Sequence, residues 1–511
     1  MANNIIANIS VPGILAVAAV LLLIKRVYWE LTVGANRRRL IKENGCKPVK
    51  KYAHKGVLGK LFGYDTMKQS FQAAKQGRLH EMSRLRNFDQ QTTIQIRNLN
   101  RDFILTIEPE NVKAVLSTKF NDFGLGGLRV KTMGPVFGTG IFTSDGKSWE
   151  HSRAMIRPNF TRQQVGDLSI YEDHVQHLLT HIPKNGQTVN LQDLFFKLTM
   201  DSATEFLFGK STNMLKKGQE HPDGDRFSDA FTYVTECMAM DFRTAQLNRL
   251  LSDPKRKDDS EFIRKFATDI IDDAIANRKD IEKGAGEKQN YIFLYELLKV
   301  TNDPYTLRSE LLNVLLAGRD TTASLLSHTF HQLARRPDVW AKLQAEVDEL
   351  GGQTPSYEAM KSMKYVKWVI NESLRLWPVV PGNNRISVRD TVLPVGGGPD
   401  GKSPMFVPKG TPVGYSVWSM HRRKDFFGED ALEFKPERWE TLRPGWEYLP
   451  FNGGPRICIG QNFALTEASY VMIRLLQNFR RIEPRDDKPW SEFQTLTLAV
   501  GNGVHVGLYQ E

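Results

Sequence analysis

The sequence lacks the patterns that define several common enzyme classes. Three of its 511 residues are cysteines, Cys46, Cys237 and Cys458, and their spacing is not paired. Unpaired cysteines fit a reducing compartment and argue against a disulfide scaffold. The chain has no HExxH motif, no paired CxxC motifs and no Walker loop, so zinc catalysis and nucleotide hydrolysis have no support. It also has no internal repeat and no low-complexity linker.

The positive charge of the chain is concentrated in one segment. The formal net charge is +11, and residues 25–60 alone hold eleven Lys or Arg and two Glu, a local net of +9. The rest of the chain is close to neutral, so the total charge does not indicate a nucleic-acid partner. The composition, 41% hydrophobic and 25% charged, fits one large globular domain with a short appendage.

An uncharged stretch at residues 5–24 precedes this basic segment. Its length matches the hydrocarbon thickness of a bilayer if it is helical. No basic residue precedes it and no small-residue cleavage site follows it, which argues against a cleaved signal peptide. The flanking charge predicts a single-pass anchor in the endoplasmic reticulum membrane, a cytoplasmic catalytic domain, and residues 37–39 and Lys42 near anionic headgroups. Because Pro12 and Gly13 interrupt the stretch, a helix lying in the membrane interface is the alternative.

The most informative segment is FNGGPRICIG, residues 451–460, which runs into an amphipathic helical pattern ending near residue 479. A cysteine at a helix start lies near the positive end of the peptide dipoles, and Arg456 adds positive charge beside Cys458. We therefore predict a stabilised thiolate, the form that binds metal. Gly454 allows a positive φ in the turn, and Gly460 removes a side chain where the backbone must approach a flat cofactor.

A second motif lies inside a long helical pattern. Asp303 and Pro304 form a helix start, and the pattern continues to residue 336, a length on the order of 50 Å. Within it lies AGRDTT, residues 317–322, with Gly318, Asp320 and Thr321. Taken alone, this hexapeptide is as compatible with a purely structural role as with a functional one. In the structural role, Gly318 is a tolerated helix glycine and the Thr321 hydroxyl bonds a carbonyl one turn earlier.

In this order, the two motifs resemble the haem loop and distal helix of the cytochrome P450 superfamily, and the resemblance covers essentially the whole chain. It implies that Cys458 is the axial iron ligand of haem b, in a pocket that Phe451, Gly454, Arg456 and Gly460 help to form. It also implies the cytochrome P450 fold, mainly α with small β-sheets (α+β). We expect an anchor at residues 1–24, a basic connector at 25–60 and a haem-thiolate monooxygenase domain at 61–511.

The resemblance assigns proton handling to the AGRDTT motif. Productive cleavage of the oxygen–oxygen bond of O2 requires two protons, delivered without release of peroxide. Thr321 is expected to steady the oxygen with its hydroxyl, and Asp320 to relay protons from solvent.

Four further residues match contacts that the superfamily makes with the haem propionates. They are Trp149 and Arg153 in WEHSR, Arg385 in NNRISV, and Arg456 in the cysteine loop. Arginine suits this role because its planar guanidinium bonds carboxylates with fixed geometry.

Three charged residues match a structural network of the superfamily. Glu372 and Arg375 are three residues apart on a predicted helix, so their side chains meet on one face. Arg438, in FKPERW, resembles the third member. An exposed pair would contribute little to stability, but the resemblance implies a partly buried network that holds the cysteine loop.

The chain has no flavin or dinucleotide fingerprint, so its electrons must come from another protein. The resemblance implies a separate NADPH-cytochrome P450 reductase. We expect it to dock near the cysteine loop, where Lys147 and Arg443 are candidate contacts.

Three segments narrow the resemblance to fungal microsomal enzymes that hydroxylate n-alkanes and fatty acids. They are residues 391–410, 415–439 and 445–470. This implies insertion of one oxygen atom from O2 at or near the end of a long apolar chain. Trp377, Trp418 and the Gly382-Asn383-Asn384 sequence depart from that pattern, and the latter three are expected near the haem pocket. Tailoring of a fungal secondary metabolite is therefore an alternative, and a haem-thiolate sensor or carrier without catalysis is a third.

The remaining pattern predicts several local elements. We expect strands at residues 92–97 and 103–107, helices at 191–208 and 264–277, a closing hairpin at 492–509 with its turn at 501–503, and a hairpin loop at 396–401. An apolar substrate needs a tunnel that opens near the membrane. The loop at residues 121–143 is the predicted lid. In it, Arg129 or Lys131 either meets a substrate carboxylate or is an ordinary exposed cation.

Overall fold

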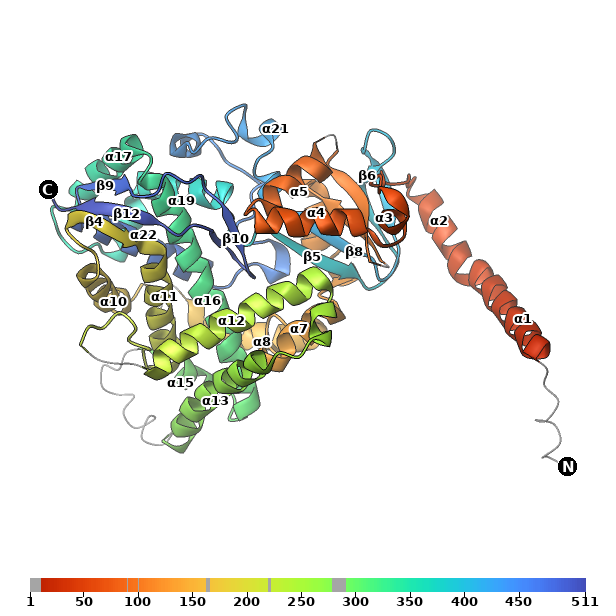
Figure 1. Cartoon of the computed structure of the whole chain (residues 1–511), viewed down its shortest axis with the longest axis horizontal. Coiled ribbons are helices and arrows are strands. Elements are labelled where there is room, and N and C mark those ends of the chain that lie inside the picture. Colours follow the sequence, from red (N-terminus) through yellow and green to blue (C-terminus); the bar gives the residue numbers. More distant parts are fainter. Residues whose placement is uncertain (1–10, 90, 100, 162–165, 219–221, 278–290) are drawn as a thin grey trace.

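A computed structural model describes residues 11–89, 91–99, 101–161, 166–218, 222–277 and 291–511. Helices dominate the described chain, and its strands form four small sheets. The predicted class, mainly α with small β-sheets, is confirmed. Figure 1 shows the larger sheet beside the base of the N-terminal helix and most of the helices on the far side of the domain.

The N-terminal helix is continuous from Val11 to Glu43. It consists of α1 (Val11–Trp29), a π-helical turn η2 (Glu30–Gly34) and α2 (Ala35–Glu43). No residue of α1 is buried, and Figure 1 shows this helix projecting away from the domain. Pro12 falls in its first described turn, where proline is tolerated, so the interruption predicted there does not break the helix. Residues 5–10 of the predicted anchor lie outside the described residues.

The C-terminal end of this helix, α2, is attached to the domain. Arg37 makes two hydrogen bonds of 2.9 Å to the Asp390 carboxylate, and Arg38 makes an ion pair of 2.7 Å with Glu30. Arg37 is therefore paired with a carboxylate of the domain, and its position near headgroups stays a prediction. Arg39 and Lys42 are exposed, as that prediction requires.

The helices of the domain follow the periodic apolar patterns of the sequence. The principal ones are α3 (Gly56–Phe62), α4 (Tyr64–Lys75), α5 (Leu79–Phe88), α7 (Gly127–Phe137), α8 (Gly146–Ile156), α10 (Ser169–Thr180), α11 (Leu191–Phe208), α12 (Pro222–Thr244), α13 (Pro254–Ala276), α15 (Phe293–Leu298), α16 (Pro304–Leu333), α17 (Pro337–Asp348), α18 (Tyr357–Ser362), α19 (Lys364–Leu376) and α22 (Gln461–Asn478). The predicted helix at 191–208 is confirmed, and the one at 264–277 begins ten residues earlier, at Pro254.

The largest sheet has five strands in the order β1-β2-β8-β5-β3, and β2 and β8 are parallel. Its strands are β1 (Thr93–Asn98), β2 (Arg101–Thr106), β8 (Pro412–Ser416), β5 (Gly382–Ser387) and β3 (Phe123–Gly124). The other three sheets pair β6 (Thr391–Gly397) with β7 (Ser403–Val407), β10 (Glu492–Gln494) with β11 (Leu498–Val500), and β12 (His505–Tyr509) with both β4 (Asn185–Asn190) and β9 (Arg481–Pro484). The predicted strands near residues 92–97 and 103–107 are confirmed, and so is the hairpin loop after residue 396.

Two predicted local elements are wrong. The closing hairpin is formed by β10 and β11 and turns at residues 495–497, whereas the glycines at 501 and 503 lead into β12, which joins another sheet. The predicted lid loop contains the helix α7. Of its apolar residues, Phe123, Leu125 and Phe137 are buried in the core. In both segments the partners that decide the structure lie far away in sequence.

The helix α16 crosses the middle of the domain and carries the AGRDTT motif. Asp303 caps it by accepting a 3.0 Å hydrogen bond from the Thr306 backbone amide, and Pro304 occupies the first turn, as predicted. The helix packs against α11, α13, α19 and α22. Because α22 begins three residues after Cys458, this packing brings the two sequence motifs into one region.

Candidate functional site

The cysteine loop is held by its own backbone. Gly454 has φ +69°, and a Cβ there would collide with the carbonyl of Leu116, so the predicted positive φ is confirmed and glycine is required. The Cys458 amide donates a 3.0 Å hydrogen bond to the Phe451 carbonyl, which closes the loop. A Cβ at Gly460 would meet only the ring of Phe160, at an ordinary 3.7 Å. Packing within the protein therefore does not require glycine at position 460. The predicted close approach of the backbone to a flat cofactor remains as the reason for glycine there.

Cys458 is accessible at its side chain, yet the surrounding protein buries it enough to affect its ionisation. Burial raises the pKa of the Cys458 thiol, and a hydrogen bond from the Gly460 amide and the charge of Arg153 lower it in part. The predicted lowering of the pKa is therefore wrong: burial outweighs the local positive charges, and Arg456 points elsewhere. Binding of a metal cation would supply the missing stabilisation of the thiolate.

A cluster of arginines lies beside this loop. The Arg456 guanidinium stacks 4.3 Å from the ring centre of the buried Trp149, and it bonds the Asp145 carboxylate at 2.7 Å and the Ser144 carbonyl at 3.0 Å. Arg153, one turn after Trp149 on α8, donates a 3.0 Å hydrogen bond to the Ile457 carbonyl. These contacts place predicted propionate ligands next to Cys458.

Two further arginines belong to the same cluster. Arg385 is buried on β5 and donates to the side-chain oxygen of Asn383, at 3.2 Å, and to the Asn384 carbonyl, at 2.7 Å. Arg129, from α7, donates to the same Asn383 oxygen at 2.7 Å. Burial, and then the charge of Arg385, lowers the pKa of Arg129 to about 10. Asn383, which departs from the family pattern, thus bridges α7 and β5.

Sequence reasoning missed Arg129 as a member of this cluster. It was expected at the mouth of the substrate tunnel or in solvent, because nothing in its local sequence distinguishes it from Lys131. Lys131 is exposed, as the second of those expectations requires. Only the pairing of β5 with β3 and the return of α7 over that sheet bring Arg129 to Arg385.

The arginine cluster has more positive charge than its protein partners balance. Arg456 is paired with Asp145, whereas Arg129, Arg153 and Arg385 bond to neutral carbonyl or amide oxygens. Burial, together with the charges of Arg385 and Arg153, lowers the pKa of Arg456 to about 10, and Asp145 offsets part of this effect. A buried site with several arginines and one carboxylate favours a ligand that carries two negative charges, as the two propionates of haem do. The donor set therefore fits haem.

The AGRDTT helix presents a narrow accessible strip toward this region. Between Ser309 and His331, only Val314, Ala317, Gly318 and Thr321 are not fully buried, and their spacing places them on one face of α16. A Cβ at Gly318 would meet only Ala203, at 3.9 Å. Val314 and Ile459, the residue after Cys458, pack against the same apolar core. The strip and the residue that follows the cysteine therefore border one apolar core.

Thr321 and Asp320 point in different directions. The Thr321 hydroxyl lies on the strip and donates a 2.7 Å hydrogen bond to the Ala317 carbonyl, one turn earlier. Asp320 is buried and accepts a 3.0 Å hydrogen bond from Arg319, whose guanidinium also bonds Thr232 of α12 at 2.9 Å. Burial raises the pKa of Asp320, and the neighbouring Arg319 offsets part of this effect.

A buried carboxyl group that sequence reasoning missed lies behind this helix. Glu467 of α22 is 2% exposed, and its Oε1 accepts a 2.6 Å hydrogen bond from the Ser202 hydroxyl of α11. Burial raises the pKa of Glu467 to about 7. A glutamate in an amphipathic helix gives no sequence signal of burial, because the helices that enclose it lie elsewhere in the chain.

The predicted network of Glu372, Arg375 and Arg438 is present: Glu372 and Arg375 are fully buried, and Arg438 is partly buried. Arg375 bonds both oxygens of Glu372, at 2.8 and 2.9 Å, and Arg438 bonds one of them at 2.9 Å. The Trp439 indole adds a fourth donor to the carboxylate, at 3.0 Å. Since every charge is paired, removing one member would leave a buried charge without its partner.

This network is linked to the cysteine loop through His421. The Arg375 carbonyl lies 3.1 Å from His421 Nδ1, and the Leu449 amide donates to Nε2 at 2.9 Å. Because Nε2 must accept, the imidazole is neutral and its proton lies on Nδ1. Burial lowers the pKa of His421 to about 3, which is consistent with the neutral form. Leu449 is two residues before Phe451, so the network positions the start of the loop, as predicted.

One cysteine facing an internal region, an arginine cluster suited to two carboxylates, and an apolar strip ending in a hydroxyl together define a haem-thiolate protein. The family model described as Cytochrome P450 matches residues 66–504, so the chain belongs to the cytochrome P450 family. It is a cytochrome P450 monooxygenase, and its family uses haem iron ligated by a cysteine thiolate.

The chain resembles cytochrome P450 proteins of Aspergillus, Fusarium and Candida over most of its length. Cytochrome P450 monooxygenase himC of Aspergillus japonicus is 44% identical over 510 residues, which are 98% of this chain and 90% of that protein. Cytochrome P450 monooxygenase fsdH of Fusarium heterosporum is 44% identical over 487 residues, 93% of this chain and 85% of that protein. Cytochrome P450 52A5 of Candida maltosa is 46% identical over 428 residues, 80% of each chain.

Proposed function

We propose that this monooxygenase inserts one oxygen atom from O2 into a terminal or near-terminal C–H bond of a long-chain apolar substrate, an n-alkane or a fatty acid. The observation that carries this proposal is the accessible strip of α16. Val314, Ala317 and Gly318 offer only apolar surface, and Thr321 contributes a single hydroxyl. Such a surface suits an alkyl chain, because it has no charged group that would need a polar partner.

The roles of the haem-binding residues follow from their positions. Haem, when bound, supplies the redox chemistry that activates O2. Cys458 would ligate the haem iron through its thiolate, while Phe451, Gly454 and Gly460 would hold its loop and leave room for the cofactor. The residues proposed to bind the two propionates are Trp149, Arg153, Arg385 and Arg456, together with Arg129.

Thr321 and Asp320 are proposed to manage protons. The Thr321 oxygen donates to Ala317 and keeps its lone pairs free to accept a hydrogen bond on the accessible side. Asp320 holds its proton more tightly than an exposed aspartate, because burial raises its pKa. It must exchange its Arg319 partner for a water or a hydroxyl before it can relay a proton, so side-chain rotation is part of this role.

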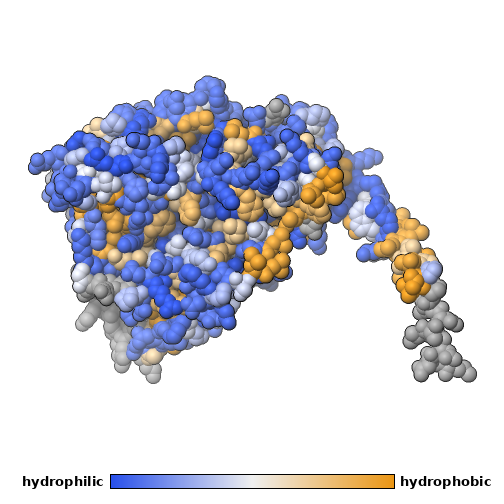
Figure 2. Space-filling model, in the orientation of Figure 1, coloured by the Kyte–Doolittle hydropathy of each residue, from blue (hydrophilic) through white to orange (hydrophobic). Residues whose placement is uncertain are grey.

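We propose a single-pass anchor in the endoplasmic reticulum membrane, with the catalytic domain in the cytoplasm. The apolar helix that begins at Val11 supports this, and its C-terminal flank carries the basic residues. Exposed apolar residues also occur on α3, where Val57 and Leu58 are 73% and 57% exposed. Figure 2 shows hydrophobic areas over α3 and over the connection of α12 to α13, on the side from which the helix extends.

A separate NADPH-cytochrome P450 reductase is the proposed electron donor. Lys147, at the start of α8, and Arg443, before the cysteine loop, are both exposed. Exposed cations near the loop can steer an acidic partner toward it, and the effect should weaken as salt increases.

Tailoring of a fungal secondary metabolite is the second candidate. The Aspergillus and Fusarium relatives are about as similar to this chain as the yeast 52A5 enzyme. Asn383, one of the residues that depart from the alkane-hydroxylase pattern in the sequence, also bonds both Arg129 of α7 and Arg385. The third candidate, a sensor or carrier without catalysis, has no support, because the chain is a monooxygenase.

Turnover assays with dodecane and lauric acid test the proposal. The full chain is combined with a fungal reductase and NADPH, and products are identified by mass spectrometry. We expect terminal or near-terminal alcohols from at least one substrate. The same assay is run with a lipid-soluble extract of fungal metabolites. If neither dodecane nor lauric acid is oxidised, but a metabolite in the extract gains the mass of one oxygen atom, the tailoring function replaces this proposal.

A further inference from the structure

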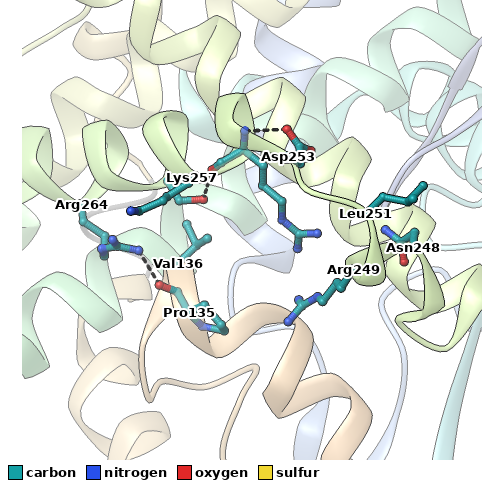
Figure 3. A pocket seen from close by; sticks show the side chains of 10 residues that line it. Pro135, Val136, Asn248, Arg249, Leu251, Asp253, Lys257 and Arg264 are labelled. Carbon is teal, nitrogen blue, oxygen red and sulfur yellow. Dashed lines mark hydrogen bonds between the residues drawn. The ribbon is translucent and has the colours of Figure 1, made fainter.

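A basic pocket lies outside the haem site, at the joint between α7 and α13. It has a volume of about 320 Å³. Its lining residues are Pro135, Val136, Asn248, Arg249, Leu251, Asp253, Arg256, Lys257, Ser260 and Arg264. Figure 3 shows Lys257 and Arg264 on one side of this pocket and Leu251 on the other.

The pocket lies where positive side chains are incompletely balanced. Arg249 and Arg256 both pair with the fully buried Asp241, at 2.5 and 2.8 Å. Arg264 donates a 2.7 Å hydrogen bond to the Pro135 carbonyl, which is neutral. Among the described residues, the ammonium of Lys257 has no hydrogen-bond or ion-pair partner. Lys257 and Arg264 are seven residues apart and therefore share one face of α13. The pocket thus offers two cations to an anion.

The remaining carboxylate of the lining does not cancel these charges. Asp253 caps α13 by accepting a 2.9 Å hydrogen bond from the Arg256 amide, and its oxygens lie 3.3 Å from the Tyr233 hydroxyl. Arg256 has donors left over after its two bonds to Asp241, so it can add a third contact. Three donors of this kind match the several oxygens of a phosphate better than the two of a carboxylate.

Exposed leucines lie next to the pocket. Leu247, Leu250 and Leu251 are 53%, 84% and 76% exposed. They lie over the α12–α13 connection, on the side of the domain from which the N-terminal helix extends (Figure 2). An exposed apolar patch beside unpaired cations is the arrangement expected at the boundary of hydrocarbon and headgroups.

We propose that this pocket binds the phosphate of an anionic membrane phospholipid, with Lys257 and Arg264 as the principal contacts, Arg256 as a third, and the leucines against the acyl chains. The inference rests on the bilayer assignment of the proposed function, but not on the substrate. The bound lipid would lie against the joint at which Arg249 also bonds the Lys131 carbonyl of α7.

Lipid titration followed by native mass spectrometry tests this proposal. The full haem-loaded chain in detergent is titrated with dioleoyl phosphatidic acid, and the Lys257→Gln/Arg264→Gln variant is compared with Lys255→Gln/Lys265→Gln. The control removes the same charge from the same helix, at residues that pair with Asp259 and Asp269 outside the pocket. We expect the pocket variant to bind the first lipid at least about tenfold more weakly, and the control to bind it as the wild type does.

Two results with the variants would overturn the lipid site: an equal loss of lipid affinity in both variants, or no loss in either. Displacement of the lipid by millimolar inorganic phosphate would indicate a free-phosphate site instead. Displacement by lauric acid would indicate a carboxylate site. A photoactivatable phosphatidic acid provides an independent measurement on the wild type: labelling of residues 131–136 or 247–264 supports the site, and labelling only within residues 25–60 contradicts it. None of these readouts requires turnover, so failure of the substrate proposal would be seen separately.

Discussion

Thr321 illustrates how two interpretations of one residue can both hold. Its hydroxyl makes the back-bond to Ala317 that any helical threonine makes, and it is also the hydroxyl on the otherwise apolar strip of α16. A donor already used inside the helix leaves an oxygen free to accept a hydrogen bond. The neighbouring Asp320 lies off the strip and is bonded to Arg319.

Replacing Thr321 with alanine should uncouple reductant use from product formation. The strip keeps its shape, so haem binding stays intact, but the hydroxyl that manages protons is lost. We expect product formation to fall by roughly tenfold to a hundredfold while NADPH is consumed and peroxide accumulates. Product, peroxide and NADPH are measured together, and Thr321→Ser should retain coupling. Tight coupling in the alanine variant would remove this role.

Glu467 predicts a specific pH dependence. Its side chain in the unfolded chain releases a proton near pH 4.5, whereas in the folded protein burial raises the pKa to about 7. Between these values the folded state binds the extra proton, so the stability due to this group is present at low pH and is lost as pH rises toward 7.

The Glu467→Gln variant should lack this dependence. Relative to the variant, the wild type should lose stability on the order of 3 kcal/mol at most between pH 4.5 and 7, and the difference should then level off. Thermal unfolding of both proteins across this range measures it. A constant difference between the two proteins at every pH would show that Glu467 is already ionised in the folded state.

At the residue scale, sequence reasoning located the chemistry but not its environment. Sequence reasoning could propose Cys458, Thr321 and Arg153 because their motifs are local. The direction of the Cys458 pKa, the membership of Arg129 in the arginine cluster, and the burial of Glu467 depend on atoms that other parts of the chain contribute. Burial is a property of packing, and the sequence around one residue does not specify it.

At the scale of elements, the cysteine loop depends on one backbone conformation. Gly454 has positive φ and lies against the carbonyl of Leu116, in a segment that packs directly on the loop. A side chain there would both strain the backbone and force these segments apart.

The Gly454→Ala variant should therefore lose haem and stability. The backbone strain alone costs about 1–3 kcal/mol, and the collision with Leu116 adds to it. Haem content per protein and the unfolding temperature measure the effect. Gly445→Ala is the matched control, because its Cβ would meet only the flexible end of Glu447, at 3.3 Å. Equal haem content in the two variants would contradict the account of this turn.

Elements with strong local signals were predicted well, and elements set by distant partners were not. The helices α11 and α16 have caps and long apolar periodicity, and they were found nearly to the residue. The helix α7 contains two glycines and a proline, which favour a loop, but packing against α12, α13 and α16 makes it helical. The turn at residues 501–503 looked like a hairpin because no local signal indicates which sheet β12 joins.

At the scale of the whole molecule, one side of the domain combines several features that support the proposed membrane anchor. The N-terminal helix leaves from this side, and the exposed apolar residues of α3 and of the α12–α13 connection face the same way (Figures 1 and 2). The ion pair of Arg37 with Asp390 ties the base of the helix to the β6–β7 hairpin region of the domain. The apolar N-terminal helix was predictable from composition, whereas its attachment to the domain was not.

Protease protection distinguishes a spanning helix from one that lies in the interface. In intact microsomes, an epitope at the N-terminus should resist protease while the catalytic domain is digested, because the basic flank keeps the domain on the cytoplasmic side. Detergent should then make the epitope accessible, which serves as the control. Digestion of the epitope in intact microsomes would support the interfacial helix instead.

The most direct test of the whole account is the spectrum of the reduced protein with carbon monoxide. If Cys458 ligates haem iron as a thiolate, the wild type should give the red-shifted absorption band of sulfur ligation, and Cys458→Ser should lose both the band and turnover. A wild-type protein that binds haem without this band, or a serine variant with full turnover, would contradict the assignment of Cys458.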